Sequence, residues 1–287
     1  MSQSQPVQTR RLNSPFRILS MFILLIWSVA VLYPLIWTGL GALKNNSQFM
    51  LGKPWALPKF PLLWSNFSNV WNQYHFDNYF VNSLFVTVIS SFLAILLAAT
   101  SAYILARFPF KGSTVFYYFY LSAMMIPMIL GLVPLFFLMN DLNLINKLGG
   151  LIIVYTVWAL PFSIFVMVSF FKTLPKELEE AAYIDGAGYY RTFFQVMLPL
   201  ARSGIISIGI MNSLNIWNEY LMGTVFVNDP TKYTVPVGIA VMQAEMQYRT
   251  EWGPLFAGLL MSMVPVVIIY ILFQRHIVEG VTAGAVK

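Results

Sequence analysis

Cysteine is absent from this chain of 287 residues, and histidine occurs only twice, at His75 and His276. Without cysteine the chain has no disulfide, no thiol nucleophile, no iron–sulfur cluster and no Cys-based zinc site. The two histidines lie far apart in sequence, and neither has a neighbour at metal-ligand spacing. We therefore expect no metal site.

Charged residues are also scarce. They make up 10% of the chain, and hydrophobic residues 58%, whereas soluble globular proteins average ~25% and ~45–50%. This composition excludes an ordinary cytosolic enzyme. The net charge of +6, from 17 basic and 11 acidic residues, is typical of proteins that bind nucleic acid or lie in a membrane, and the apolar composition favours the membrane without any nucleic-acid partner.

Several catalytic motifs are missing. The chain contains no G-x-x-x-x-G-K-[ST], no H-E-x-x-H and no G-x-S-x-G. Any ATP that this protein uses must therefore be bound by another polypeptide. An intramembrane enzyme is disfavoured, and we predict that the chain is not itself an enzyme.

Six nearly uncharged runs reach the ~20 residues that an α-helix needs to cross a bilayer. We predict an all-α integral membrane protein with six transmembrane helices, over residues 18–43, 78–106, 112–140, 148–171, 199–222 and 252–274. The first run is too long for a signal peptide and has no small-residue cleavage site after it, so it is interpreted as a retained helix. No linker divides the chain, which predicts a polar tail over 1–14 and one membrane domain over 15–287.

An even number of crossings places both termini on one side of the membrane. That side carries 11 of the 17 basic residues, which predicts that it is cytoplasmic. The largest cytoplasmic connection is then residues 172–198, and the outer connections are 44–77, 141–147 and 223–251. This arrangement corresponds to a multi-pass protein of a cell membrane.

Glu219 is the single charged residue between Ser203 and Asn228, and the other five predicted spans contain none. Counted from Pro199, it lies roughly 30 Å along a helix, near the outer interface. Ion-coupled transporters place such groups near the midplane instead. Two interpretations stay open: a wetted polar residue at a helix end, or a residue that lines a transport path.

The connection 172–198 predicts a short cytoplasmic helix. Pro175 suits its first position, and the acidic residues that follow are stabilised by the partial positive charge at the start of a helix. One face is formed at i, i+3, i+4, i+7 spacing by Leu178, Ala181, Ala182 and Asp185. Gly186 allows a change of direction after the helix. Such a short helix is marginal alone in water, so it either packs on its own bundle or binds a partner.

This loop resembles the hallmark of permease subunits of binding-protein-dependent ABC importers. The family pattern is EAA, three residues, G, nine residues, I, one residue, LP. Here Glu180-Ala181-Ala182 is followed at the same spacings by Gly186, Val196 and Leu198-Pro199, with Val196 in place of Ile. From about residue 15 to the C-terminus, the chain is similar to the maltose-permease-like, sugar-importing branch, including the Asp-Gly-Ala after EAA, WNEY at 217–220 and the closing FQRHIVEGVTAGAVK.

The resemblance implies the fold and the partners. It implies a type I ABC importer permease fold in a bacterial or archaeal cytoplasmic membrane, a second permease subunit that is usually a different chain, two ATPase subunits and an extracytoplasmic sugar-binding protein. ATP and Mg²⁺ would be used by the ATPase, and no cofactor would be bound here. The implied ATPase-coupling residues are Glu180, Ala181, Ala182, Asp185, Gly186, Leu198 and Pro199.

The same resemblance directs attention to the segment Trp217–Tyr220 as a candidate wall of the sugar path. Aromatic faces stack on sugar C–H surfaces, and Asn218 and Glu219 can bond to hydroxyls. Anchoring of Trp217 and Tyr220 at the membrane interface is an equal alternative. For the whole protein, the competing hypothesis is a stand-alone secondary transporter or channel for a small polar solute.

Overall fold

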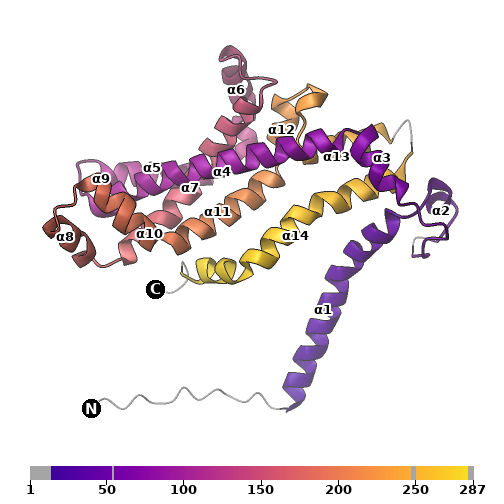
Figure 1. Ribbon diagram of the computed structural model, residues 1–287, viewed down its shortest axis with the longest axis horizontal. Helices are drawn as coiled ribbons and strands as arrows, with labels where there is room; N and C mark the ends of the chain where they lie inside the picture. Colours follow the sequence, from indigo (N-terminus) through magenta and orange to yellow (C-terminus); the bar gives the residue numbers. More distant parts are fainter. Residues whose placement is uncertain (1–13, 54, 247–249, 284–287) are drawn as a thin grey trace.

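The computed structural model describes residues 14–53, 55–246 and 250–283 (Figure 1). This part of the chain is built of helices and contains no β-strand, which confirms the all-α class. The predicted tail, 1–14, lies outside the described residues except for Ser14.

Four helices are long and apolar enough to cross a membrane. They are α1 (Ser14–Gly41), α4 (Phe76–Arg107), α7 (Leu148–Thr173) and α14 (Trp252–Ala283). These four helices coincide with the first, second, fourth and sixth predicted spans. Within the described residues the count reaches six when each of two bent helix pairs is taken as one span.

The third predicted span is one of these pairs. Residues 112–140 were expected as one helix, but α5 (Ser113–Met125) and α6 (Met128–Asp141) meet at 103°. The break lies at Ile126 and Pro127. A residue before proline avoids the helical region because of a steric clash, and Ile126 is extended, with ψ 117°. The span is therefore broken near its middle.

The fifth span is also shorter and more bent than predicted. Its straight part, α11, covers Arg202–Trp217, and it meets the preceding segment, Tyr189–Leu200, at 73°. Pro199 was expected to begin the span, but it belongs to that preceding segment. The expected end at residue 222 is also too late, because the helix stops at Trp217 and a new short helix begins at Leu221.

The core lies between α4 and α7. Small side chains on α4, including Ala98, Ala99 and Ala102, are fully or almost fully buried and pack near Ile164 and Met167 of α7. In a membrane, small residues let two helices approach closely and gain van der Waals contact. These two spans therefore form a rigid pair, and α11 packs against α4 in turn.

Short elements gather at the two ends of the spans (Figure 1). At one end lie α2 (Asn46–Met50), α3 (Ser65–Gln73), α12 (Leu221–Phe226), η2 (Pro230–Lys232) and α13 (Val235–Glu245). At the other end lie α8 (Glu177–Ile184), α9 (Tyr189–Thr192), the π-helix η1 (Phe193–Met197) and α10 (Leu198–Leu200). The connections predicted to lie outside and those predicted to lie inside are thus at opposite ends.

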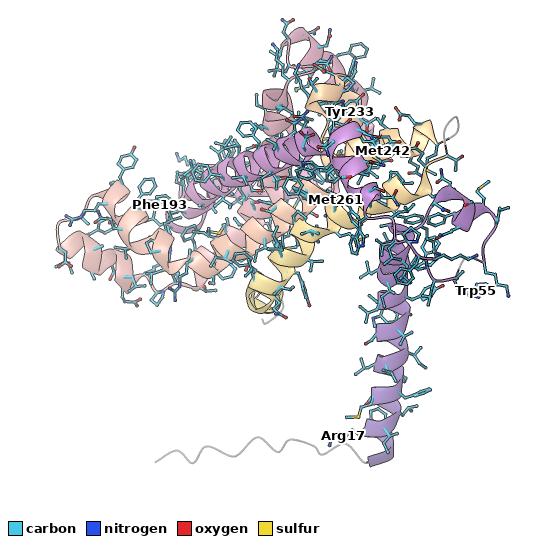
Figure 2. The ribbon with its side chains drawn as sticks, turned by 45° about the vertical axis from the view of Figure 1, so that its right-hand side comes forward. Arg17, Trp55, Phe193, Tyr233, Met242 and Met261 are labelled. Atoms are coloured by element: carbon cyan, nitrogen blue, oxygen red, sulfur yellow. The ribbon has the colours of Figure 1, made fainter. Side chains whose placement is uncertain are left out.

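Helix α1 stands apart from the other spans. It runs away from the bundle toward Arg17 (Figure 2), and the most apolar window of its span has no buried residue. Its contact with the bundle is near its far end, where Trp37 meets Phe256 of α14 edge-on at 4.9 Å between ring centroids. Its apolar surface therefore needs cover from lipid or from another subunit.

Candidate functional site

Helix α8 carries the loop motif at the tip of one end of the molecule (Figure 1). It begins at Glu177, two residues after Pro175, where the sequence predicted its start. Three glutamates occupy its first turn. Their carboxylates face the partial positive charge of the free amides there, which stabilises so short a helix. The predicted helix is present, and its acidic start explains it.

The motif residues divide between two sides of α8. Glu180, Ala181, Asp185 and Gly186 are exposed, whereas Ala182 is 8% exposed and packs on the chain itself. Leu198 is half-buried and Pro199 is exposed, in α10. The two adjacent alanines therefore do not share one exposed face, and the surface that a partner can reach is the edge from Glu180 to Gly186.

Gly186 ends α8 in a left-handed conformation, with φ 77°. Its N–H donates to the carbonyl of Tyr183 at 3.0 Å, and the N–H of Ala187 donates to that of Ala182 at 2.9 Å. This pair of bonds is the Schellman arrangement, which uses glycine because other residues are strained at positive φ. Gly188, two residues later, has φ −75°, a conformation that does not require glycine.

Aromatic rings attach this end to the spans. Phe193 of η1 (Figure 2) lies 5.0 Å from Tyr103 of α4 and 6.5 Å from Phe171 of α7, between ring centroids. Tyr183 of α8 lies 5.7 Å from Tyr189. Burial and the neighbouring Glu179 carboxylate raise the pKa of Tyr183, so this phenol is neutral at pH 7 and packs as an uncharged ring.

At the other end, Glu219 is buried in the break between α11 and α12. Its side chain is 9% exposed, so the interpretation as a wetted residue is wrong. Tyr155 donates its hydroxyl to Oε2 at 2.6 Å. The N–H groups of Met222 and Gly223 donate to the same carboxylate at 2.8 and 3.2 Å. Glu219 thus holds the start of α12 against α7.

The other residues of Trp217–Tyr220 differ in exposure. Trp217 is 4% exposed and donates from Nε1 to the carbonyl of Ser262 at 3.1 Å, so it anchors α11 to α14. Asn218 and Tyr220 are exposed. Together with Trp217, both line a cavity of about 300 Å³ whose other walls come from α13 and α14. The segment therefore combines buried supports with exposed polar side chains.

A second cavity, of about 470 Å³, lies between α5, α7 and α11, and α11 contributes Asn212 and Asn215 to its wall. Asn212 is buried and donates to Oγ of Ser163 at 2.9 Å, whereas Asn215 is exposed. With Asn218, these asparagines recur every third residue along α11. That spacing is the signal in the sequence that points to these residues, and it lies outside the motifs considered above.

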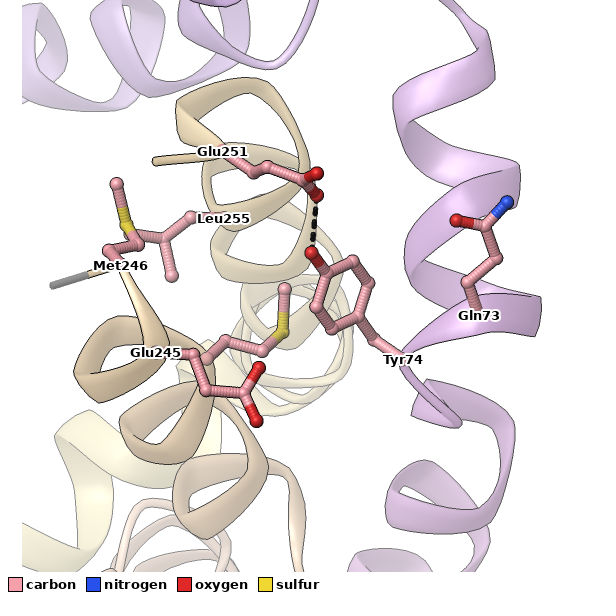
Figure 3. Close-up of a pocket in the computed structure, with 7 residues that line it drawn as sticks. Gln73, Tyr74, Glu245, Met246, Glu251 and Leu255 are labelled. Carbon is pink, nitrogen blue, oxygen red and sulfur yellow. Dashed lines mark hydrogen bonds between the residues drawn. The ribbon is translucent and has the colours of Figure 1, made fainter. Parts of the chain in front are cut away.

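A third, smaller cavity of about 130 Å³ lies among α3, α13 and α14 (Figure 3). Glu245 and Glu251 line it, and Tyr74 donates a hydrogen bond to Glu251. Across the described ranges of the chain, no group of three His, Cys, Asp or Glu side chains comes together. The cavity offers two carboxylates but no built cation site.

Apolar spans, cavities between them that carry asparagine side chains, and an exposed acidic helix at one end are typical of a multi-pass membrane transport protein. A family model described as "Binding-protein-dependent transport system inner membrane component" matches residues 90–282. The chain belongs to this family, as the loop motif predicted.

Relatives cover almost the whole chain. The diacetylchitobiose uptake system permease protein NgcG of Streptomyces coelicolor is 39% identical over 272 residues, which are 95% of this chain and 89% of NgcG. The trehalose/maltose transport system permease protein MalG of Thermococcus litoralis is 32% identical over 273 residues, covering 94% and 97%. The inner membrane ABC transporter permease protein YcjP of Escherichia coli is 34% identical and covers 92% and 94%. The chain is thus an ABC-transporter permease.

A solved structure shares the fold. The crystal structure of a bacterial ABC transporter involved in the import of the acidic polysaccharide alginate contains a chain that matches with a TM-score of 0.80 and 24% identity. The match covers 94% of this chain and 99% of the other. The predicted importer-permease fold is therefore confirmed.

Proposed function

We propose that this chain is a permease subunit of an ATP-driven importer for a sugar or oligosaccharide. The observation that carries the proposal is the exposed edge of α8, which presents an acidic residue, a small residue and a glycine turn at the tip of the molecule. Relatives named for diacetylchitobiose and for trehalose and maltose support the substrate class. A stand-alone secondary transporter has no use for such a docking edge.

The edge of α8 would bind a separate ATPase subunit, which would hold ATP and Mg²⁺. This chain would bind no cofactor and catalyse no reaction, because it lacks a phosphate-binding loop. Glu180 would pair with a basic group of the ATPase, Ala181 would permit close approach, and Asp185 and Gly186 would form the rim of the contact. Ala182, Leu198 and Pro199 would support the edge from behind.

A second permease would complete the path. The uncovered apolar length of α1 and the open sides of the cavities along α11 supply surface for it, in addition to surface for lipid. Residues 15–287 would form one membrane domain. Both termini and α8 would be cytoplasmic, because the basic residues concentrate there. The opposite end, with α3 and α13, would receive a sugar-loaded binding protein.

The path would run along the asparagines of α11. The amides of Asn215 and Asn218 can exchange hydrogen bonds with hydroxyls, and Tyr220 offers an aromatic face near the outer end. Glu219 would act behind this surface as a buried support, whereas Trp217 would both anchor α11 to α14 and form part of the cavity wall. Movement of the spans would then open the path to each side in turn.

Co-purification tests the proposal. The tagged chain is purified from its native membrane in mild detergent, co-eluting subunits are identified, and ATP hydrolysis is measured with and without the extracytoplasmic fraction. We expect an ATPase, a second permease and hydrolysis stimulated by a sugar-loaded binding protein. A chain that purifies alone and moves solute into liposomes without ATP would instead establish the secondary transporter.

Substitution of the exposed asparagines tests the path. Asn215→Ala and Asn218→Ala are each expected to lower kcat/KM for uptake by about two- to tenfold, because a neutral hydrogen bond contributes about 0.5–1.5 kcal/mol. Asn72→Ala on the outer helix α3, whose amide bonds to Ser68, is the matched control. Uptake kinetics are measured in intact cells at equal membrane content. Unchanged kinetics in both path variants would remove these residues from the path.

The two glycines that follow α8 give a test of its geometry. Neither would bring a new Cβ within 4 Å of another atom, but Gly186 has φ 77° and Gly188 has φ −75°. Gly186→Val is expected to cost about 1–2 kcal/mol locally and to reduce uptake, whereas Gly188→Val is expected to be nearly silent. Both are compared by uptake at equal membrane content. Equal behaviour of the two variants would contradict the role of the turn.

A further inference from the structure

The inner ends of two spans are joined to α8 by a buried ion pair. Nε of Arg107, the last residue of α4, lies 3.7 Å from Oε2 of Glu179, and the two side chains are 4% and 12% exposed. Nη2 of Arg107 also donates to the carbonyl of Leu174, directly after α7, at 2.6 Å. One guanidinium therefore connects the ends of α4 and α7 with the first turn of α8.

This connection is not fully closed. A charge-assisted N–H···O bond measures about 2.7–2.9 Å, so the pair is almost 1 Å too long. Three buried atoms have no hydrogen-bond partner among the described residues: Nε of Arg107, Oε1 of Glu179 and Oη of Tyr103. The hydroxyl of Tyr103 nevertheless lies close enough to the Glu179 carboxylate to interact with its charge. Because buried charges interact strongly, a displacement of α8 by an ångström changes the energy of this cluster.

Helix α8 has few other attachments to the spans. Ala182 is its single buried residue, and Tyr183 packs against Tyr189 and interacts with Tyr103 of α4. In contrast, α4 and α7 pack tightly against one another along the core. A force applied to α8 therefore reaches the paired spans through Arg107, through Tyr103 and the aromatic contacts of η1, and through the two chain connections of α8.

We propose that Arg107 and Glu179 are positioning residues that transmit the movement of α8 to α4 and α7 during transport. This inference rests on the proposed docking of α8 on an ATPase. It adds a role that the loop motif does not include, since Arg107 lies 72 residues before Glu179 in the chain. In this role Glu179 faces the spans, whereas its neighbour Glu180 faces the partner.

The test uses the complete transporter in liposomes and measures solute moved per ATP hydrolysed. Arg107→Lys keeps the charge but cannot bond both Leu174 and Glu179, and Glu179→Gln removes the charge at constant shape. Each is expected to lower this ratio by about tenfold while hydrolysis continues, because each removes a charged interaction of this buried cluster. Arg191→Lys and Glu177→Gln, both at exposed positions on the same end, are the matched controls.

The double variant Arg107→Gln with Glu179→Gln removes both charges together and leaves neither one unpaired. It is expected to assemble, even where a single variant does not. Its ratio of solute moved to ATP hydrolysed should be below the parental ratio, but the fold-loss should be smaller than the product of the two single fold-losses. A parental ratio in the double variant would overturn the proposal. Failure of the proposed function would be seen separately, because the unmutated chain would then bind no ATPase.

Discussion

Membrane vesicles that carry Glu180→Lys are expected to lose ATP-driven uptake while containing as much of the chain as parental vesicles. Glu180 is exposed in the first turn of α8. Loss of a charge-assisted contact costs about 1.5–3 kcal/mol, and like charges placed together cost several kcal/mol more. The unfavourable interaction of lysine with the helix dipole adds only about 0.3–1 kcal/mol. The docking contact therefore dominates the expected effect.

Two further variants make this prediction specific. Glu180→Gln removes the attraction without adding repulsion, so its uptake should lie between those of the parent and of Glu180→Lys. Asp141→Lys reverses an exposed charge at the opposite end of the molecule and should leave uptake unchanged. Uptake is measured together with the amount of co-purified ATPase. Parental values of both for Glu180→Lys would exclude Glu180 from the docking contact.

The positions of the spans followed from the sequence because lipid imposes a local requirement, about 20 apolar residues per crossing. The breaks did not follow, because proline alone does not decide them. Pro34, Pro161 and Pro265 lie inside continuous helices, whereas the chain bends at Pro127. The break at Pro127 lets α6 reach α12, where Asn146 donates to the carbonyl of Phe226 at 2.9 Å. Such a contact between distant segments is not encoded in local preference.

Helix α8 shows the same division. Its place in the chain was predictable from the motif and from its glutamates, which are local features. The side that each residue faces was not, because it depends on partners that are distant in sequence. Arg107 turns Glu179 inward, and packing on the bundle turns Ala182 inward. Only the conformation of Gly186 could be anticipated from residue type, since glycine favours positive φ.

Glu219 illustrates a further limit. Counting residues from Pro199 placed it at the outer end of a continuous helix, but α11 ends at Trp217. The carboxylate then accepts hydrogen bonds from the first N–H groups of α12 and from Tyr155, 64 residues earlier in the chain. Helix periodicity contains no information about that tyrosine. The structure thus excludes the wetted alternative for Glu219 and makes it a buried support of the start of α12.

Because Glu219 supports the start of α12, we expect a large loss of stability when its side chain is shortened to that of alanine. Glu219→Ala leaves the hydroxyl of Tyr155 and the N–H groups of Met222 and Gly223 without an acceptor. Each buried unpaired donor costs about 1–3 kcal/mol, so the variant should lose at least about 3 kcal/mol. Its Tm in detergent should fall clearly below that of the parent, and its folded yield should fall with it.

Two milder variants separate support from contact with the solute. Tyr155→Phe removes one donor and leaves the carboxylate bonded to two N–H groups, so it should cost only about 1 kcal/mol. Glu219→Gln retains one acceptor oxygen and should lie between Tyr155→Phe and Glu219→Ala in Tm. If Glu219 is a support, uptake by these variants follows their folded amount, with an unchanged KM. A raised KM at parental Tm in Glu219→Gln would instead place the carboxylate in contact with the solute.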